Sequence, residues 1–152
     1  MSVARPLPAT LALLLFASAC ATSATDTSSP DSPLWRVSMS VSGGLRGIVQ
    51  SFEVTDSGWF SAMDRRQRIT RTGRLSETKR ERVATLLAEL DTDRASARGG
   101  VISRCADCVH YDLQLAVADA RTVVRLDSLN VGQSSYAALV KVLVSELRKA
   151  LQ

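Results

Sequence analysis

The most constraining feature of this 152-residue chain is the spacing of its apolar residues, which alternates between a strand period and a helix period. Apolar and polar residues alternate along the segments 34–41 and 48–54, which is typical of strands that bury one face, and a third strand is predicted at 59–64. Turn sequences at 42–47 and 55–58 separate these segments. Short turns between successive strands predict an antiparallel meander.

A strongly basic fourth strand is predicted at 65–74, with a turn on its near side. Its arginines are Arg65, Arg66, Arg68, Arg71 and Arg74. On a strand, Arg66 and Arg68 would share one side and form a stripe able to meet phosphate or carboxylate groups. Two interpretations stay open: an edge strand whose charge prevents aggregation, and a surface for anionic lipid headgroups or glycan. Nucleic acid is not expected as a partner, because no aromatic residues interleave these arginines.

The helix period occurs twice along the chain. Ser76 can cap a first helix, whose apolar residues lie three and four positions apart. They are Val83, Leu86, Leu87 and Leu90. Ser134 or Ser135 is predicted to begin a second amphipathic helix. Its apolar residues are Tyr136, Leu139, Val140, Leu143 and Leu147.

Between the two helices, residues 109–117 alternate again and are predicted to pair with 121–126 across a turn at 118–120. The order is therefore strands, helix, strands, helix. It predicts the α+β class, with an antiparallel β-meander and hairpin and two amphipathic helices packed on one face. The opposite face, which carries Ser, Arg and Gln, would meet water or a partner.

Residues 1–19 have the order of a secretory signal peptide: Arg5, an apolar run from Leu11 to Ala17, and small residues before Cys20. A small residue directly before a cysteine resembles the lipobox of bacterial lipoproteins, which implies that Cys20 is acylated and becomes the mature N-terminus. Ala17 stands where the commonest lipobox has Leu. The alternative is an ordinary cleaved signal with an incidental cysteine.

Residues 20–33 are rich in Ser, Thr and Pro and are predicted to be a tether, while 34–152 suffice for a single domain. Removal of 1–19 would leave a net charge of about +3, too weak for a typical nucleic-acid binder. The predicted location is the bacterial cell envelope, with the lipid anchor in the outer membrane and the domain on its periplasmic or surface face.

The stretch "SRCADCVHYDL" holds Cys105, Cys108 and the chain's single histidine, His110. In an oxidising compartment a structural disulfide between the cysteines is favoured. A redox-active pair and a metal site are the alternatives, although the stretch offers three of the four ligands that zinc prefers. His110 is expected to be a half-exposed strand residue. With one histidine and no catalytic motif, we expect neither an enzyme nor a cofactor.

From Val37 to Leu151 the chain resembles the emfourin-like proteins, small proteinaceous inhibitors of thermolysin-like metalloproteases. The resemblance is carried by "SGGLRG", "DSGW", "GRLSETKRERVATLLAEL" and "CVHYDLQLAV". It implies an α+β binding protein that blocks the cleft of a zinc protease without metal or catalysis of its own. The lipobox, the tether and the cysteine pair depart from the plain inhibitors.

An inhibitor needs a rigid loop that enters a cleft, because preorganisation reduces the entropy lost on docking. The glycine turn at 42–47 is the candidate, with Leu45 and Arg46 on it, although a plain connecting turn is the simpler interpretation. The predicted partner is another protein. The predicted partner-binding residues are Gly43, Gly44, Leu45, Arg46, Arg66 and Arg68.

Overall fold

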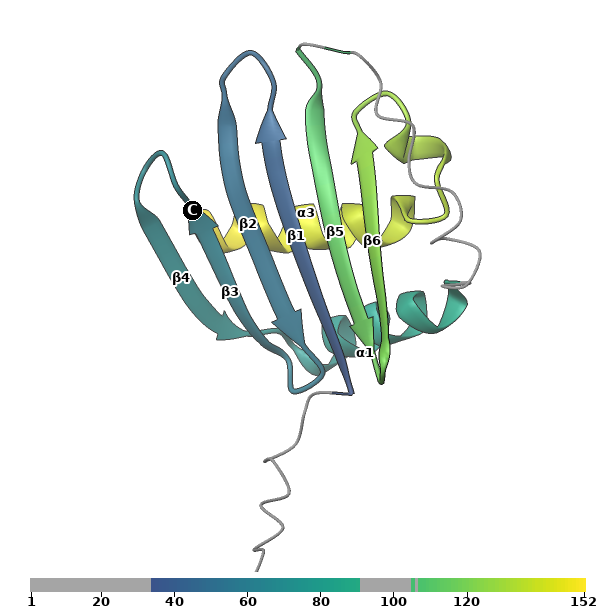
Figure 1. Cartoon of the computed structure of the whole chain (residues 1–152). Helices are drawn as coiled ribbons and strands as arrows, with labels where there is room; N and C mark the ends of the chain where they lie inside the picture. Colours follow the sequence, from purple (N-terminus) through teal and green to yellow (C-terminus); the bar gives the residue numbers. More distant parts are fainter. Residues whose placement is uncertain (1–33, 91–104, 106) are drawn as a thin grey trace, which may run out of the picture. The chain divides into compact units, whose positions relative to one another are not determined.

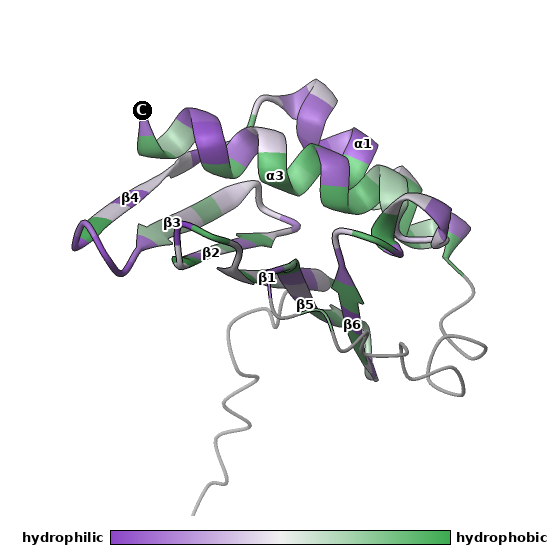
Figure 2. Ribbon diagram, turned by 90° about the horizontal axis from the view of Figure 1, so that it is seen from above, coloured by the Kyte–Doolittle hydropathy of each residue, from purple (hydrophilic) through white to green (hydrophobic). Residues whose placement is uncertain are grey.

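The computed structural model describes residues 34–90, 105 and 107–152, which form a six-stranded antiparallel sheet with two helices on one face (Figures 1 and 2). This confirms the predicted α+β class. The predicted signal peptide (1–19) and the predicted tether (20–33), with Cys20, lie outside the described residues. The elements are β1 (Trp35–Gly43), β2 (Ile48–Thr55), β3 (Trp59–Asp64), β4 (Ile69–Arg74), α1 (Glu77–Glu89), β5 (Val109–Val117), β6 (Ala120–Asp127), the short 3₁₀ helix η1 (Val131–Gln133) and α3 (Ala137–Leu151).

The strand β1 joins the two halves of the sheet. The strand order is β4-β3-β2-β1-β5-β6, so the meander lies on one side of β1 and the hairpin on the other. In the register, Met39 lies opposite both Phe52 and Leu113. Side chains opposite each other point to the same face, so alternate residues of the central strands meet in one core.

The core lies between this face and the helices. Val83, Leu86 and Leu87 are the buried residues of α1. Those of α3 are Leu139, Val140, Leu143 and Leu147. Figure 2 shows both helices on the same side of the sheet. The predicted apolar stripes are thus the surfaces that pack, with Leu90 only partly buried at the end of α1.

The two helices begin differently from each other. Ser76 is the N-cap of α1, as predicted, although its hydroxyl makes no capping bond. The start predicted for α3 at Ser134 or Ser135 is wrong, since α3 begins at Ala137 with Tyr136 as its N-cap. The hydroxyl of Ser134 instead donates to the Val131 carbonyl (2.8 Å) at the end of η1.

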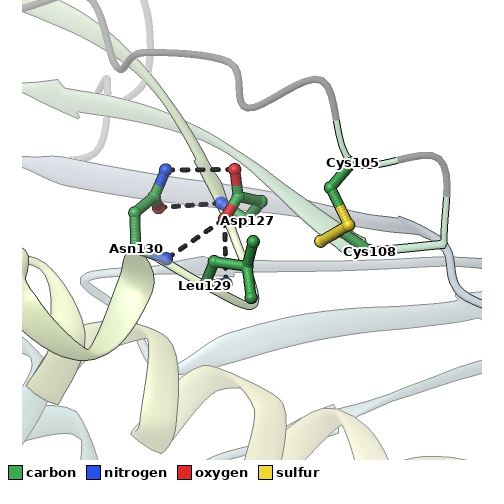
Figure 3. Close-up of a disulfide and its surroundings, with 5 residues drawn as sticks. All are labelled: Cys105, Cys108, Asp127, Leu129 and Asn130. Atoms are coloured by element: carbon green, nitrogen blue, oxygen red, sulfur yellow. Dashed lines mark hydrogen bonds between the residues drawn. A yellow bond between two sulfur atoms is a disulfide. The ribbon is translucent and has the colours of Figure 1, made fainter.

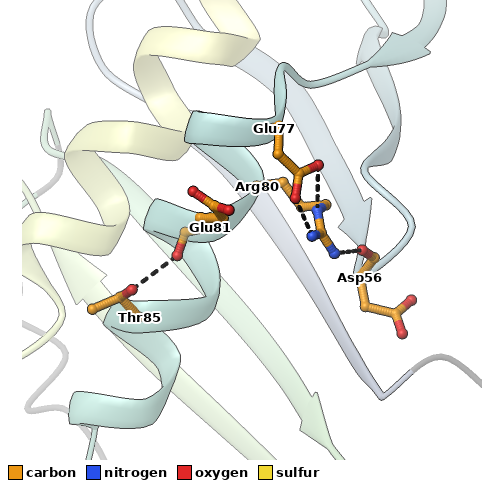
Figure 4. A network of polar contacts seen from close by, with 5 residues as sticks. All are labelled: Asp56, Glu77, Arg80, Glu81 and Thr85. Carbon is orange, nitrogen blue, oxygen red and sulfur yellow. Dashed lines mark hydrogen bonds and ion pairs between the residues drawn. The ribbon is translucent and has the colours of Figure 1, made fainter.

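Polar contacts fix α1 to its neighbours (Figure 4). Arg80 donates from Nη1 to the carbonyl oxygen of Asp56 (2.9 Å) and from Nε to Oε2 of Glu77 (3.0 Å). Lys79 Nζ lies 2.7 Å from Oε2 of Glu146 on α3. The Asp56 contact ties α1 to the β2–β3 turn, and the Glu146 contact ties the helices together.

The sheet has two ends that differ in what they carry. We call one the distal end: it comprises the β1–β2 turn (44–47), the β3–β4 turn (65–68), the Cys105–Cys108 disulfide and residues 128–130. Leu34, where the described chain enters β1, lies at the opposite end (Figure 1). No helix among the described residues is long and apolar enough to cross a membrane.

Candidate binding surface

The distal end brings together all the predicted partner-binding residues. Gly43, Gly44, Leu45 and Arg46 belong to the end of β1 and the turn after it. Arg66 and Arg68 lie in the β3–β4 turn beside it, and Arg66 Nη1 donates to the carbonyl oxygen of Arg46. Cys20, the predicted lipidation residue, lies outside the described residues.

The glycine turn is seated directly on the disulfide segment. Gly43 and Gly44 have positive φ angles of 91° and 69°, which residues with a side chain adopt only with strain. The N–H of Gly44 donates to the carbonyl oxygen of Cys108 (3.0 Å). A Cβ on Gly43 would lie only 2.5 Å from that oxygen. The turn can approach the disulfide this closely only because Gly43 has no side chain.

Cys105 and Cys108 form a disulfide, with Cα atoms 5.4 Å apart (Figure 3). Cys108 is buried and leads into β5. His110 is a half-exposed residue of that strand, as predicted. The bond joins two residues three positions apart, next to the start of β5. No group of three or more His, Cys, Asp or Glu side chains in the described part of the chain is arranged to hold a metal ion.

A polar loop beside the disulfide adds rigidity (Figure 3). Oδ1 of the buried Asp127 accepts the N–H groups of Leu129 (2.8 Å) and Asn130 (3.1 Å). The Asn130 side chain donates to Oδ2 of Asp127 (3.1 Å) and accepts the Asp127 N–H (2.9 Å). This loop was not predicted from the sequence. An Asp followed by Asn three residues later is a turn signal that could have revealed it.

Two leucines project from this end into solvent. Leu45 is 90% exposed on the glycine turn, and Leu129 is 68% exposed on the polar loop. Single exposed apolar residues are common on surfaces. Hydrogen bonds, however, fix the backbone at both Leu45 and Leu129.

The predicted basic stripe is wrong in its geometry. Arg66 and Arg68 lie in the turn before β4 and not on the strand, because the chain reverses at 65–68 and Arg68 is left-handed (φ 56°). Only Arg71 and Arg74 lie on β4. β4 is an edge of the sheet, as the simpler interpretation required. Arg74 stacks over the Trp59 ring, 5.1 Å from its centroid.

A buried carboxylate supports the β3–β4 turn. Asp64 Oδ2 accepts from Gln50 Nε2 (2.8 Å), and Oδ1 accepts the Gln67 N–H (2.9 Å). The bond from Gln50, followed by that from Gln67, lowers the pKa of Asp64 below its ordinary value of 3.8, against the effect of burial. The carboxylate is therefore charged at neutral pH and fixes the turn that carries Arg66.

A hollow of about 570 Å³ opens between the two turns and the end of α3. Arg46, Arg66 and Arg148 line it together with Ile48, Gln50 and Asp64. Arg148 was not predicted as a site residue, and it lies more than 80 positions from the other two arginines. Only the packing of α3 across the sheet brings it to this site, so no local sequence signal could have revealed it.

Comparison with known proteins adds no family to this description: no protein-family model matches the chain, and no curated protein matches it.

Proposed function

We propose that this protein is a noncatalytic envelope lipoprotein whose domain binds another protein through the distal end. The observation that carries the proposal is Leu45, a large apolar side chain that is 90% exposed on a turn anchored to the disulfide segment. Interfaces gain most of their affinity from a few apolar or aromatic anchors that enter pockets on the partner. A preorganised turn presents such an anchor with little loss of entropy on docking.

The predicted lipid anchor at Cys20 agrees with this arrangement. A tether that joins the domain at Leu34 reaches it at the end of the sheet opposite Leu45. The distal end is then left open to a partner in the periplasm or at the cell surface. Attachment to the outer membrane is part of the proposal.

The target that the resemblance implies is a thermolysin-like metalloprotease. Leu45 would offer its side chain to a hydrophobic specificity pocket, and Arg46 would contact the rim of the cleft. The test is hydrolysis of a peptide substrate by thermolysin in the presence of micromolar purified protein. We expect inhibition by the wild type, and unchanged hydrolysis would remove this target.

Two variants locate the inhibitory surface. Leu45→Asp places a charge on the proposed anchor and is expected to abolish inhibition. Val123→Asp makes the same change at a residue that is 60% exposed on β6, outside the distal end, and should inhibit like the wild type. Equal inhibition by both variants would exclude Leu45 as the anchor.

A second candidate function is contact with anionic lipid or glycan. It is favoured by Arg65, Arg66 and Arg68, which are exposed and form no ion pair with any carboxylate in the described part of the chain. It predicts salt-sensitive co-sedimentation with anionic liposomes that is lost when Arg66 and Arg68 become Gln. Absence of co-sedimentation would leave protein binding as the function.

A further inference from the structure

A second hollow, of about 620 Å³, lies along α3. It is bounded by Tyr111 of β5, by Val131 of η1, and by Val140 and Val144 of α3. Arg148 lines both this hollow and the arginine-lined hollow between the two turns. The two hollows therefore share the side chain of Arg148 on α3, and we call this pair of hollows the α3 groove.

The half of the α3 groove next to η1 is mostly apolar. Tyr111 and Val144 are only partly buried there, although both pack against the core. The row of the sheet that contains Tyr111 lies close to the distal end, where α3 does not cover it fully. An apolar side chain could therefore bury surface in this half without displacing any core residue.

The other half carries an excess of positive charge. Arg46, Arg66 and Arg148 line it, and none of them forms an ion pair with a carboxylate within the described ranges. Asp64 also lines this half as a charged carboxylate, but the three guanidinium groups outnumber it. Guanidinium groups bind carboxylates through paired, charge-assisted hydrogen bonds. This half is therefore complementary to an acidic ligand.

We propose that the α3 groove binds an extended acidic segment of the partner protein, with an apolar side chain in one half and carboxylates in the other. This inference rests on the proposed function, because it names the chemistry of the protein bound at the distal end. The charge of the arginine half supports the carboxylates. Val140, Val144 and Arg148 line the groove at successive turns of α3, which supports an extended chain.

The rise of α3 sets the expected distance between the apolar residue of the ligand and its first carboxylate. Arg148 lies about 6 Å along the axis from Val144 and about 12 Å from Val140, at about 1.5 Å per residue. An extended chain advances about 3.3 Å per residue. The preferred segment therefore has its first carboxylate about two to four positions from the apolar residue.

The test uses a fluorescein-labelled peptide with two Leu residues, a Ser-Gly spacer and two Glu residues, made in both sequence directions. Fluorescence anisotropy with the purified full-length protein is expected to show saturable binding of at least one of them. Replacing both Glu by Gln should weaken binding by about tenfold or more. Equal binding of the Glu and Gln peptides, or binding of neither, would overturn the proposal.

Matched variants place the site. Arg66→Gln combined with Arg148→Gln should weaken binding of the acidic peptide by about tenfold or more. Arg121→Gln removes a cation of β6 that does not line the groove and should bind like the wild type. Thermal unfolding checks that each variant is folded. If the Arg121→Gln protein loses as much affinity for the peptide as the Arg66→Gln/Arg148→Gln protein, the attraction is nonspecific and the proposal is overturned.

Two further measurements separate the possible causes of failure. If phosphatidylglycerol vesicles bind with the same dependence on Arg66 and Arg148 while the peptide does not, the groove is a lipid site and the proposal is wrong. The Leu45→Asp protein should still bind the peptide, because Leu45 does not line the groove. If the peptide does not bind, the groove proposal is refuted and the proposed role of Leu45 is not. If changing Leu45 does not affect binding of the partner protein, the role of Leu45 is refuted and the groove proposal is not.

Discussion

At the scale of single residues, the distal end depends on groups that fix the backbone and leave other side chains exposed. Gly43 lets the turn reach the Cys108 carbonyl, and Asp64 holds the turn that carries Arg66. Both determine where Leu45 and the arginines lie, so changes at either one test the surface indirectly.

Gly43→Ala should destabilise the fold by about 2 kcal/mol, since it adds a Cβ against the Cys108 oxygen at a positive φ. Urea unfolding followed by circular dichroism measures the change. Gly132→Ala is the control, because a Cβ there meets nothing within 4 Å. A Gly43→Ala protein as stable as the control variant would contradict the close contact between turn and disulfide.

Asp64→Asn should destabilise the protein in a pH-dependent way. Hydrogen bonds from Gln50 and Gln67 lower the pKa of Asp64 in the folded state, so its stabilising effect is complete above the ordinary value of 3.8 and is lost as the pH falls through the folded value. The difference in unfolding free energy between wild type and variant should therefore shrink in acid. A difference that stays constant from neutral pH to well below 3.8 would contradict this assignment.

At the scale of elements, an ion pair links α1 to α3, the helix that lines the α3 groove. Glu146 of α3 accepts from both Lys79 of α1 (2.7 Å) and Lys149 (3.2 Å), and only 11% of its side chain is exposed. Burial raises the pKa of Glu146, but the bonds from Lys79 and Lys149 outweigh burial and leave the pKa below 4.5. The bond to Glu146 also raises the pKa of Lys79.

Glu146→Gln should cost about 1 kcal/mol of stability at neutral pH, because it removes one charge of a partly exposed pair. The loss should fade as the pH falls below about 4.5, where the wild-type carboxylate is protonated in the unfolded state and then in the folded state. Glu89→Gln, at the exposed end of α1, is the control and should be neutral. Equal effects of the two variants would contradict a link between the helices.

The positions of the strands and helices could be predicted from the sequence, but the residues that tertiary packing brings together could not. The alternation in 109–117 and the spacing of Leu139, Leu143 and Leu147 reflect burial of one face, so the strand β5 and the stripe of α3 are where they were predicted. The start of α3 was missed, because the Ser134 hydroxyl bonds within η1. Arg148 was missed, because its approach to Arg66 depends on tertiary packing alone.

At the scale of the whole molecule, the sheet separates the proposed attachment from the proposed contact. Leu34, which follows the predicted tether, and Leu45 lie at opposite ends of β1. The six strands and two helices then serve as a rigid spacer between these ends. Such a role requires that Cys20 carries lipid, which can be tested separately.

Metabolic labelling with tritiated palmitate should label the wild type and leave Cys20→Ala unlabelled, because the proposed acylation needs that thiol. The variant should also leave the membrane fraction. The double variant Cys105→Ala/Cys108→Ala retains Cys20 and is expected to keep the label. Label retained by Cys20→Ala would show that the N-terminal sequence is not a lipoprotein signal.

The most direct test of the central claim, that the distal end binds another protein, is site-specific photocrosslinking in cells that express the full-length chain. Benzoylphenylalanine would replace Leu45 in one protein and Asp119, in the turn at the opposite end of the sheet, in another. We expect benzoylphenylalanine at position 45 to form a discrete protein adduct and at position 119 to form none. An adduct from position 119 alone would contradict the central claim.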